Sequence, residues 1–181
     1  MAETKPELRK VRCFVAVEVP KEYTSDFFEI QKKFDLCCKK TNVNSFHLTL
    51  SFLGEISLDD VQKVILKLKE IKFEPFIVSL IGTHYFLSRK NPAAFFVGIE
   101  SNELCELQKL VSQKLQVFEN REYVPHLTLF RIKEVYDDKA FKDTVSSINY
   151  KKEFEASEFF LFSSMLTPAG PIYTVLEKFK L

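Results

Sequence analysis

The tetrapeptide His-Leu-Thr-Leu occurs twice in this chain, first at His47 and again at His126, 79 positions later. The chain has three histidines, so two of them share one sequence context. In a β-strand, residues i and i+2 point to the same face, which places His47 beside Thr49 and His126 beside Thr128. The leucines face the opposite side, where they can pack. Each copy therefore predicts a strand with an imidazole and a hydroxyl on one face and an apolar face behind them.

Two such pairs that face each other could carry out acid–base chemistry on a phosphodiester. An imidazole has an unperturbed pKa of about 6.5, so near neutral pH one ring can be neutral while the other is protonated. The neutral ring takes a proton from a nucleophile and the protonated ring gives one to a leaving group, each contributing typically about 10²–10⁴-fold. The threonine hydroxyls can donate hydrogen bonds to the non-bridging oxygens. We expect His47, Thr49, His126 and Thr128 to form one catalytic site.

Regular strand alternation also assigns the residues that follow each motif. It puts Ser51 on the face of His47 and Phe52 on the face of the leucines. Along the second copy it turns Arg131 away from His126. Arg131 can then reach a cleft beside His126 only from a strand end or through a β-bulge.

Five residues near the motifs are candidates for substrate binding. Arg121 and Arg131 flank the second motif and are natural partners for a phosphate, with surface salt bridges as the alternative. Phe14, Phe46 and Tyr123 could stack on a nucleobase. A position in the core is the alternative for each of these rings, because the chain contains 19 phenylalanines and 6 tyrosines.

Incidental polar residues and a zinc site are the alternatives to an acid–base site. One His-x-Thr on a strand is weak evidence, but two copies at equivalent places in a duplicated chain favour a function. Zinc requires three or four ligands, and no third Cys, His or carboxylate stands at ligand spacing from His47 and His126. The sequence therefore predicts no metal and no cofactor. The third histidine, His84, belongs to no repeat and is predicted to be structural or on the surface.

Hydrophobic periodicity predicts alternating strands and helices around the motifs. The expected strands cover residues 12–19, the first motif up to residue 54, 76–87, 94–100, the second motif from residue 126, 154–163 and 172–179; the expected helices cover 22–39, a segment starting at 57, 103–118 and 137–148, with a turn at 168–171. The adjacent Cys37 and Cys38 are expected to be helical.

The same order of elements occurs twice, as strand, helix, motif strand, acidic-capped helix and strand. The two acidic pairs, Asp59-Asp60 and Asp137-Asp138, lie 78 positions apart, close to the spacing of the motifs. This predicts an α+β fold of two similar, pseudo-duplicated lobes of antiparallel sheet, covered by helices, with a central cleft. We expect a single domain over 1–181, with approximate repeat halves 12–88 and 94–164 and a closing strand 171–180.

Composition narrows the class of protein further. The chain has 181 residues and a formal net charge of +1, which argues against coating of nucleic acid by bulk electrostatics. Its N-terminus is polar and lacks an apolar segment typical of a signal peptide, and no run is long enough to span a membrane. The four cysteines lack C-x-x-C spacing, which favours reduced thiols over a disulfide framework. We expect a cytoplasmic monomer that does not bind membranes.

The motifs resemble those of the 2H phosphoesterase superfamily, and specifically its RNA 2′,3′-cyclic phosphodiesterase branch, also called 2′-5′ RNA ligase. The similarity extends over essentially the whole chain. It includes the opening strand from Arg12 to Pro20, the first motif from His47 to Gly54, the second from Arg121 to Arg131, the Phe-Phe-Leu-Phe-Ser-Ser segment, and Gly170 to Tyr173. Family members often carry an Arg after the proline at position 92, where this chain has Ala93, and a Trp before the first motif, where it has none.

The resemblance implies a bilobal fold and hydrolysis of a terminal 2′,3′-cyclic phosphate of RNA to a 2′-phosphomonoester. In that scheme His126 activates water, His47 protonates the departing 3′ oxygen, and Thr49 and Thr128 hold the phosphate. Family members also join RNA ends through a 2′-5′ linkage, the chemical reverse with an RNA hydroxyl in place of water. A module that binds nucleotides without turnover and a phosphodiesterase for small cyclic nucleotides are the alternative functions.

Overall fold

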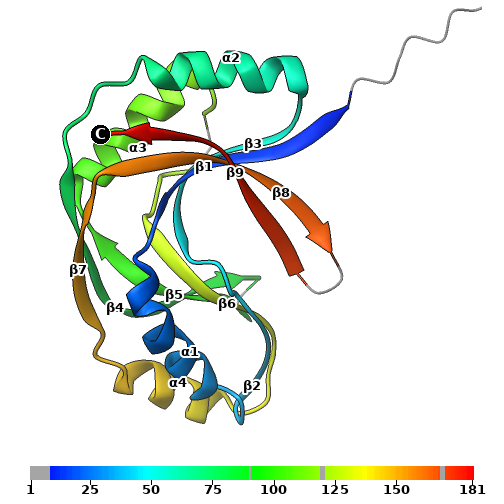
Figure 1. The fold of residues 1–181 in the computed structure, drawn as a ribbon. Helices are drawn as coiled ribbons and strands as arrows, with labels where there is room; N and C mark the ends of the chain where they lie inside the picture. The colour runs from blue at the N-terminus through cyan, green and yellow to red at the C-terminus, as the bar shows by residue number, and fades with distance from the viewer. Residues whose placement is uncertain (1–8, 90, 119–120, 168–169) are drawn as a thin grey trace, which may run out of the picture.

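The computed structural model describes residues 9–89, 91–118, 121–167 and 170–181 (Figure 1). In chain order its elements are β1 (Lys10–Glu18), the 3-10 helix η1 (Lys21–Tyr23), α1 (Thr24–Lys32), β2 (Cys38–Asn42), β3 (His47–Ser57), α2 (Leu58–Lys69), β4 (Phe76–Ser88), β5 (Asn91–Glu100), α3 (Asn102–Leu115), β6 (His126–Val135), α4 (Asp138–Ser147), β7 (Lys151–Ala156), β8 (Glu158–Thr167) and β9 (Gly170–Lys180).

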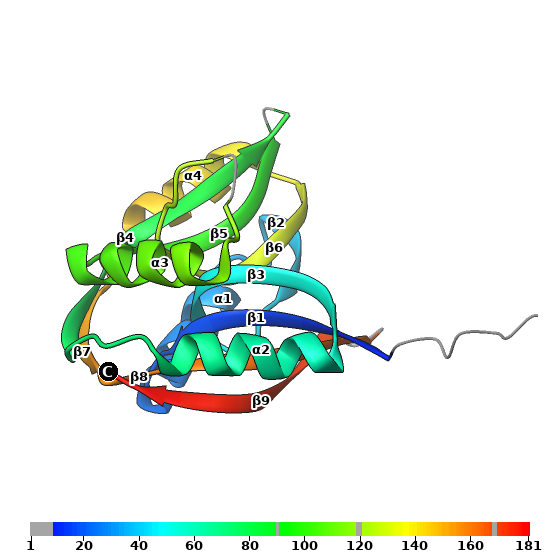
Figure 2. The same cartoon turned by 90° about the horizontal axis from the view of Figure 1, so that it is seen from above.

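The strands of the described residues form two antiparallel sheets. The first sheet has the order β3-β1-β8-β9 and the second the order β2-β6-β5-β4-β7. α2 packs on the first sheet, α1 and α4 pack on the second, and α3 contacts both β3 and β4. In Figure 1 the first sheet and α2 lie above the second sheet, α1 and α4, and Figure 2 shows the same arrangement from above. The predicted α+β fold of two antiparallel lobes is confirmed.

Each sheet contains strands from both halves of the chain. β4 follows α2 in the sequence but pairs with β5 in the second sheet, and β8 pairs with β1 in the first. In the first sheet, β1 lies between the motif strand β3 and β8, which comes from the other half of the chain. In the second sheet, β5 lies between the motif strand β6 and β4, which again comes from the other half. The halves 12–88 and 94–164 are therefore not themselves the lobes, and their boundaries as repeat units stay a prediction.

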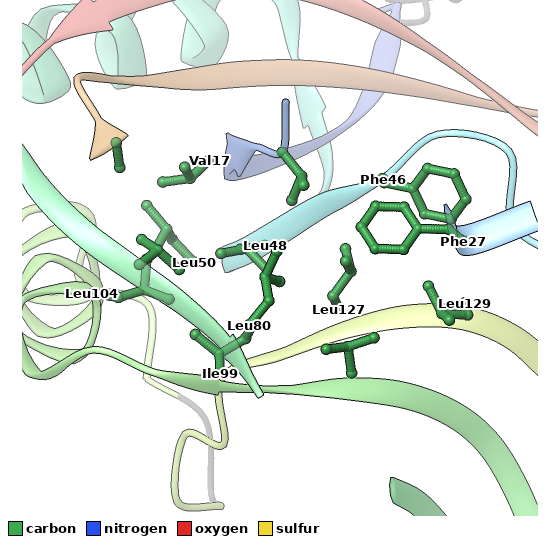
Figure 3. Packing of buried hydrophobic residues seen from close by; sticks show 14 of the residues in the cluster. Val17, Phe27, Phe46, Leu48, Leu50, Leu80, Ile99, Leu104, Leu127 and Leu129 are labelled. Atoms are coloured by element: carbon green, nitrogen blue, oxygen red, sulfur yellow. The ribbon is translucent and has the colours of Figure 1, made fainter. Parts of the chain in front are cut away.

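The leucines of both motifs meet in one hydrophobic core. Leu48, Leu127 and Leu129 are fully buried, and Leu50 has 2% of its surface exposed. Figure 3 shows these side chains converging with residues of neighbouring strands and of α3. Burying a leucine side chain contributes about 1.5–3 kcal/mol, so these leucines hold each motif strand with its apolar face inward. The predicted burial of the leucines of each motif is confirmed.

The two helices that were predicted to begin at acidic pairs, α2 and α4, start with side-chain caps. At the start of α2, Ser57 Oγ accepts a hydrogen bond from the backbone N–H of Asp60 at 3.1 Å. At the start of α4, Asp137 Oδ1 accepts one from the N–H of Ala140 at 2.9 Å. Such caps contribute about 1 kcal/mol each. The predicted starts of both helices are confirmed.

The helix predicted over 22–39 is shorter than expected. After α1 the chain turns, and Cys38 begins β2, which pairs with β6. Cys37 lies in the turn, so the expectation that both cysteines are helical is wrong. Phe34 supplies the reason, because its fully buried ring packs on the second sheet, with its centroid 4.5 Å from that of Phe95. The sequence near the end of α1 contains no residue that predicts a helix end. The helix ends there because of the tertiary contact made by Phe34.

The strand predicted over 154–163 is two strands. β7 pairs with β4 in the second sheet, whereas β8 pairs with β1 in the first. The chain crosses between the sheets at Ser157, whose carbonyl accepts a hydrogen bond from the N–H of Leu181 at 2.9 Å. The prediction missed this break because apolar residues continue on both sides of it. The turn predicted at 168–171 lies partly outside the described residues.

Candidate active site

The four motif side chains line one cleft between the two sheets. The cleft has a volume of about 620 Å³, and its lining includes His47 and Thr49 from β3 and His126 and Thr128 from β6. Pockets for small ligands in proteins typically measure about 300–1,000 Å³. The structure therefore brings the two sequence motifs together around a space large enough for a nucleotide.

A second groove is larger but chemically unsuited to an anion. It measures about 1060 Å³ and lies between the end of β5, the start of α3 and the segment before β4. Glu74, Glu100 and Glu103 line it, and none of the motif residues does. Three carboxylates repel a phosphate, so we assign the phosphate chemistry to the smaller cleft.

The backbone and two phenylalanines orient the ring of His126. Its Nδ1 lies 2.8 Å from the carbonyl oxygen of Val124. A carbonyl oxygen can only accept, so Nδ1 carries the proton and Nε2 is the proton-accepting nitrogen of the neutral ring. Phe86 and Phe96 pack edge-on against the imidazole, with centroid distances of 4.9 and 5.5 Å.

His47 has a matching environment in the other lobe. The backbone of Ser45, two residues earlier, hydrogen-bonds its ring, the same sequence relation as for His126. The imidazole centroid lies 4.9 Å from the ring of Phe14 and 5.1 Å from that of Tyr173. Both imidazole rings are thus held by aromatic rings and by a hydrogen bond to the backbone two residues earlier. These contacts restrict the rotation of the rings.

Burial lowers the pKa of both imidazoles. For His47 it is the largest cause, and with a smaller contribution from His126 it lowers the pKa to about 4, while the backbone of Ser45 opposes the shift. For His126, burial again dominates, the charge of Arg131 lowers the pKa further, and the carbonyl of Val124 opposes it. Without a bound anion, both rings are therefore neutral at pH 7.

A β-bulge follows the threonine of each motif and changes the strand alternation. Opposite β1 the extra residue is Leu50, and opposite β5 it is Leu129. Each bulge moves the residue five positions after the histidine, Phe52 or Arg131, onto the cleft face, where both line the cavity. The bulge that Arg131 was predicted to require is present. The predicted faces of Phe52 and Ser51 were wrong: Phe52 lies in the cleft, and Ser51 is 3% exposed on the core side.

A buried glutamine stabilises the second bulge. Gln31 of α1 donates from Nε2 to the carbonyl oxygens of Leu129 and Val43, each at 2.8 Å. The N–H of Val43 also donates to the carbonyl of Leu129 at 2.9 Å. Gln31 is 2% exposed, so these bonds satisfy a buried amide as well as the irregular strand. The orientation of Arg131 therefore depends on a helix that is remote in sequence.

The predicted substrate-binding residues divide into three groups. Phe14 and Arg131 line the cleft, although Phe14 is 3% exposed because it packs against His47. Phe46 does not line the cleft: it is 9% exposed and its ring packs on Phe27 in the core, so it cannot stack on a base.

Tyr123 and Arg121 are not among the described residues that line the cleft. The Tyr123 hydroxyl donates to the carbonyl of Thr49 at 3.0 Å, which joins the segment before β6 to β3. Tyr123 thus links the two half-sites, and its stacking on a base stays a prediction. Arg121 is exposed to solvent, and the structure gives it no place in the cleft.

Among the residues missed in the sequence, two carry polar groups into the cleft and a third packs behind its lining. Arg12 and Tyr173 line the cavity from β1 and β9, and Phe162 of β8 supports the ring of Phe14 at 5.1 Å. Strand alternation alone would have placed Arg12 on the face of Phe14, two residues later. The sequence around Tyr173 contains no comparable signal, because only the pairing of β9 with β8 brings this residue to the site.

The described residues contain no group of three or more His, Cys, Asp or Glu side chains placed to hold a metal ion. In the same part of the chain, no helix has the length and apolar character needed to cross a membrane.

The sequence model of the family described as LigT like Phosphoesterase matches residues 17–96 and, a second time, residues 97–173. The chain belongs to the LigT-like phosphoesterase family. The resemblance inferred from the two motifs is thereby confirmed, and each match to the family contains one His-x-Thr motif.

Relatives of this LigT-like phosphoesterase are similar over nearly their whole length. A protein of Methanocaldococcus jannaschii named RNA 2′,3′-cyclic phosphodiesterase is 33% identical over 178 residues, which cover 93% of this chain and 99% of that protein. One of the same name from Aquifex aeolicus is 33% identical over 187 residues, covering 96% and 99%.

Solved structures share the fold of this LigT-like phosphoesterase. TT0787 of Thermus thermophilus superposes with a TM-score of 0.78 at 26% identity, covering 94% of this chain and 97% of that one. Escherichia coli LigT complexed with 3′-AMP superposes with a TM-score of 0.77 at 20% identity, covering 96% and 99%.

Proposed function

We propose that this protein is an enzyme that hydrolyses the terminal 2′,3′-cyclic phosphodiester of RNA to a 2′-phosphomonoester, without a metal. The observation that carries the proposal is that both His-Thr pairs line one cleft, one from each lobe. The names of the relatives from Methanocaldococcus jannaschii and Aquifex aeolicus support the same activity. Our proposed substrate is therefore RNA that ends in a cyclic phosphate.

In the proposed reaction the cyclic phosphate lies between the two threonines, whose hydroxyls donate to its non-bridging oxygens. His126 accepts a proton from water at Nε2, and the water oxygen forms the new bond to phosphorus. The bond from phosphorus to the 3′ oxygen breaks, and protonated His47 gives its proton to that oxygen. With its pKa lowered to about 4, His47 is neutral in the free protein at pH 7 and becomes protonated when the bound phosphate anion stabilises its imidazolium; it then gives up the proton readily. With an RNA hydroxyl in place of water, the reverse chemistry joins two ends through a 2′-5′ linkage.

A short RNA with a 2′,3′-cyclic phosphate end tests the proposal directly. We expect conversion of the cyclic end to a 2′-monophosphate at the same rate with and without a chelator. The product is identified by mass and by its sensitivity to phosphatase. Persistence of the cyclic end would contradict the proposal, and tight nucleotide binding without product would favour a binding module.

The pH dependence follows from the lowered pKa values of both histidines. The proposed reaction requires one proton on the two rings, placed on His47, and the fraction of free protein with one proton on the pair is largest between the two pKa values. Since one is about 4 and the other lies below 6.5, the bell-shaped profile of kcat/KM should be centred on the acid side of pH 6.5. A bound phosphate anion stabilises the imidazolium, so the profile of kcat should move to higher pH.

Rates measured across pH at constant ionic strength give both profiles. A kcat/KM maximum above pH 7 would show that burial does not control these histidines. A kcat profile displaced to lower pH than that of kcat/KM would show that substrate binding does not favour the charged ring.

A cytoplasmic location and a monomeric state stay predictions. The four cysteines are free thiols, and three of them are buried. Burial raises the pKa of Cys38 to about 11, so this thiol is a poor nucleophile. Unpaired thiols suit the reducing compartment that we propose.

A further inference from the structure

Two arginines enter the cleft from opposite lobes and have no carboxylate partner among the described residues. Arg12 of β1 and Arg131 of β6 both line the cavity. The ion pairs in this part of the chain all involve lysines, and neither guanidinium takes part in one. Glu55 is the cross-strand neighbour of Arg12 but is exposed and does not pair with it. Two unneutralised cations in one cleft form a site for an anion.

Tyr173 connects this cationic end of the cleft to the histidines. Its ring packs edge-on against His47 at 5.1 Å, and its hydroxyl lies close enough to Arg131 and Arg12 for both charges to lower its pKa, against the larger effect of burial. In the first sheet Tyr173 pairs with Ser164, and Ser163 pairs with Cys13, next to Arg12. Tyr173 therefore spans the distance between the acid–base site and the arginines.

The backbone of Arg12 lies well along β1 from the position that faces Thr49. Thr49 pairs across the sheet with Ala16, four residues from Arg12. At about 3.3 Å per residue, this separation is roughly 13 Å along β1. Arg131 is closer, because Thr128 and Arg131 pair with Phe96 and Ala94, only two residues apart on β5. The backbone register therefore places Arg12 farther than Arg131 from a phosphate held by the threonines.

We propose that Arg12, with Tyr173 beside it, binds a second phosphate, the one attached to the 5′ oxygen of the terminal nucleoside. In an RNA this group is the last internucleotide phosphodiester. The proposal rests on the proposed function and refines it: the preferred substrate is an oligonucleotide with a cyclic end, in preference to a cyclic mononucleotide. Arg12 would then distinguish RNA ends from small cyclic nucleotides.

Three substrates separate the contributions of the second phosphate: a nucleoside 2′,3′-cyclic phosphate, its 5′-phosphorylated form, and a dinucleotide with the same cyclic end. We expect the second phosphate to raise kcat/KM about tenfold in both larger substrates, the size of one charge-assisted hydrogen bond. Arg12→Gln should abolish this gain, and Arg12→Lys should keep part of it. A neutral methylphosphonate linkage in the dinucleotide should also abolish it, with no further loss in Arg12→Gln.

Arg9→Gln is the matched control, because Arg9 is an exposed arginine near Arg12 that does not line the cleft. A gain that survives in Arg12→Gln, or is absent from the native protein, would overturn the inference and leave the proposed function intact. A gain for the 5′-phosphorylated mononucleotide alone would assign the site to free nucleotides and overturn the preference for RNA.

Failure to hydrolyse all three substrates would overturn the proposed function itself. Equilibrium binding of a nucleoside 2′,5′-bisphosphate and of the 2′-monophosphate then tests Arg12 without turnover. We expect about tenfold tighter binding of the bisphosphate, lost in Arg12→Gln. Equal affinities would count against the second phosphate site.

Discussion

Replacing His47 or His126 with glutamine is expected to lower kcat for RNA with a cyclic end by about 10²–10⁴-fold, the typical contribution of a general acid or base. Glutamine keeps a polar side chain in the cleft but cannot exchange a proton near neutral pH. Single-turnover measurements with saturating enzyme report the chemical step, and thermal unfolding shows whether the fold is intact. The double variant should lose little more than the weaker single variant, because the two rings act as one unit.

His84→Gln is the matched control for the histidine variants, since His84 is exposed and does not line the cleft. It should keep native kcat. Retention of more than a tenth of native kcat by either His47→Gln or His126→Gln would remove that ring from the proposed acid–base pair.

Replacing Thr49 or Thr128 with valine is expected to lower kcat by about 10²-fold, near the lower end of values for loss of one hydrogen-bond donor to a developing oxyanion. Valine has the shape of threonine without the hydroxyl. Both threonines are partly exposed on the cleft face, so the change leaves the core intact. The loss should appear in kcat more than in KM, because the hydrogen bonds strengthen as charge develops on the phosphate.

Serine variants at the same positions test whether the hydroxyl is responsible. Thr49→Ser and Thr128→Ser keep the donor and should recover most of the native kcat. If serine and valine impair the reaction equally, the threonine methyl group and its packing, and not the hydrogen bond, would account for the loss.

The sequence determined the faces of the two motif strands. Alternation put the histidines and threonines on one side and the leucines on the other, and the burial of Leu48 and Leu127 agrees with it. Helix caps at Ser57 and Asp137 were equally predictable. These features depend on residues within a few positions of one another, so a single sequence contains the information that decides them.

The paths of whole elements were less predictable, because pairing partners decide them. α1 ends early where Phe34 packs on the second sheet, and the chain passes between sheets at Ser157. The exchange of β4 and β8 between sheets is likewise a matter of which strands lie side by side. Hydrophobic periodicity indicates which face of one segment is buried, but it does not indicate which strand that segment pairs with.

The tertiary structure also decided which residues beyond the two His-x-Thr motifs reach the cleft. Bulges at Leu50 and Leu129 bring Phe52 and Arg131 to the cleft, against the alternation that holds for the motifs. Gln31 satisfies the carbonyl of Leu129 from a helix that is almost a hundred positions earlier in the chain. The sequence determined the acid–base groups, because their geometry is local. Only the tertiary structure placed the charges around them, because a bulge forms where distant groups satisfy its backbone.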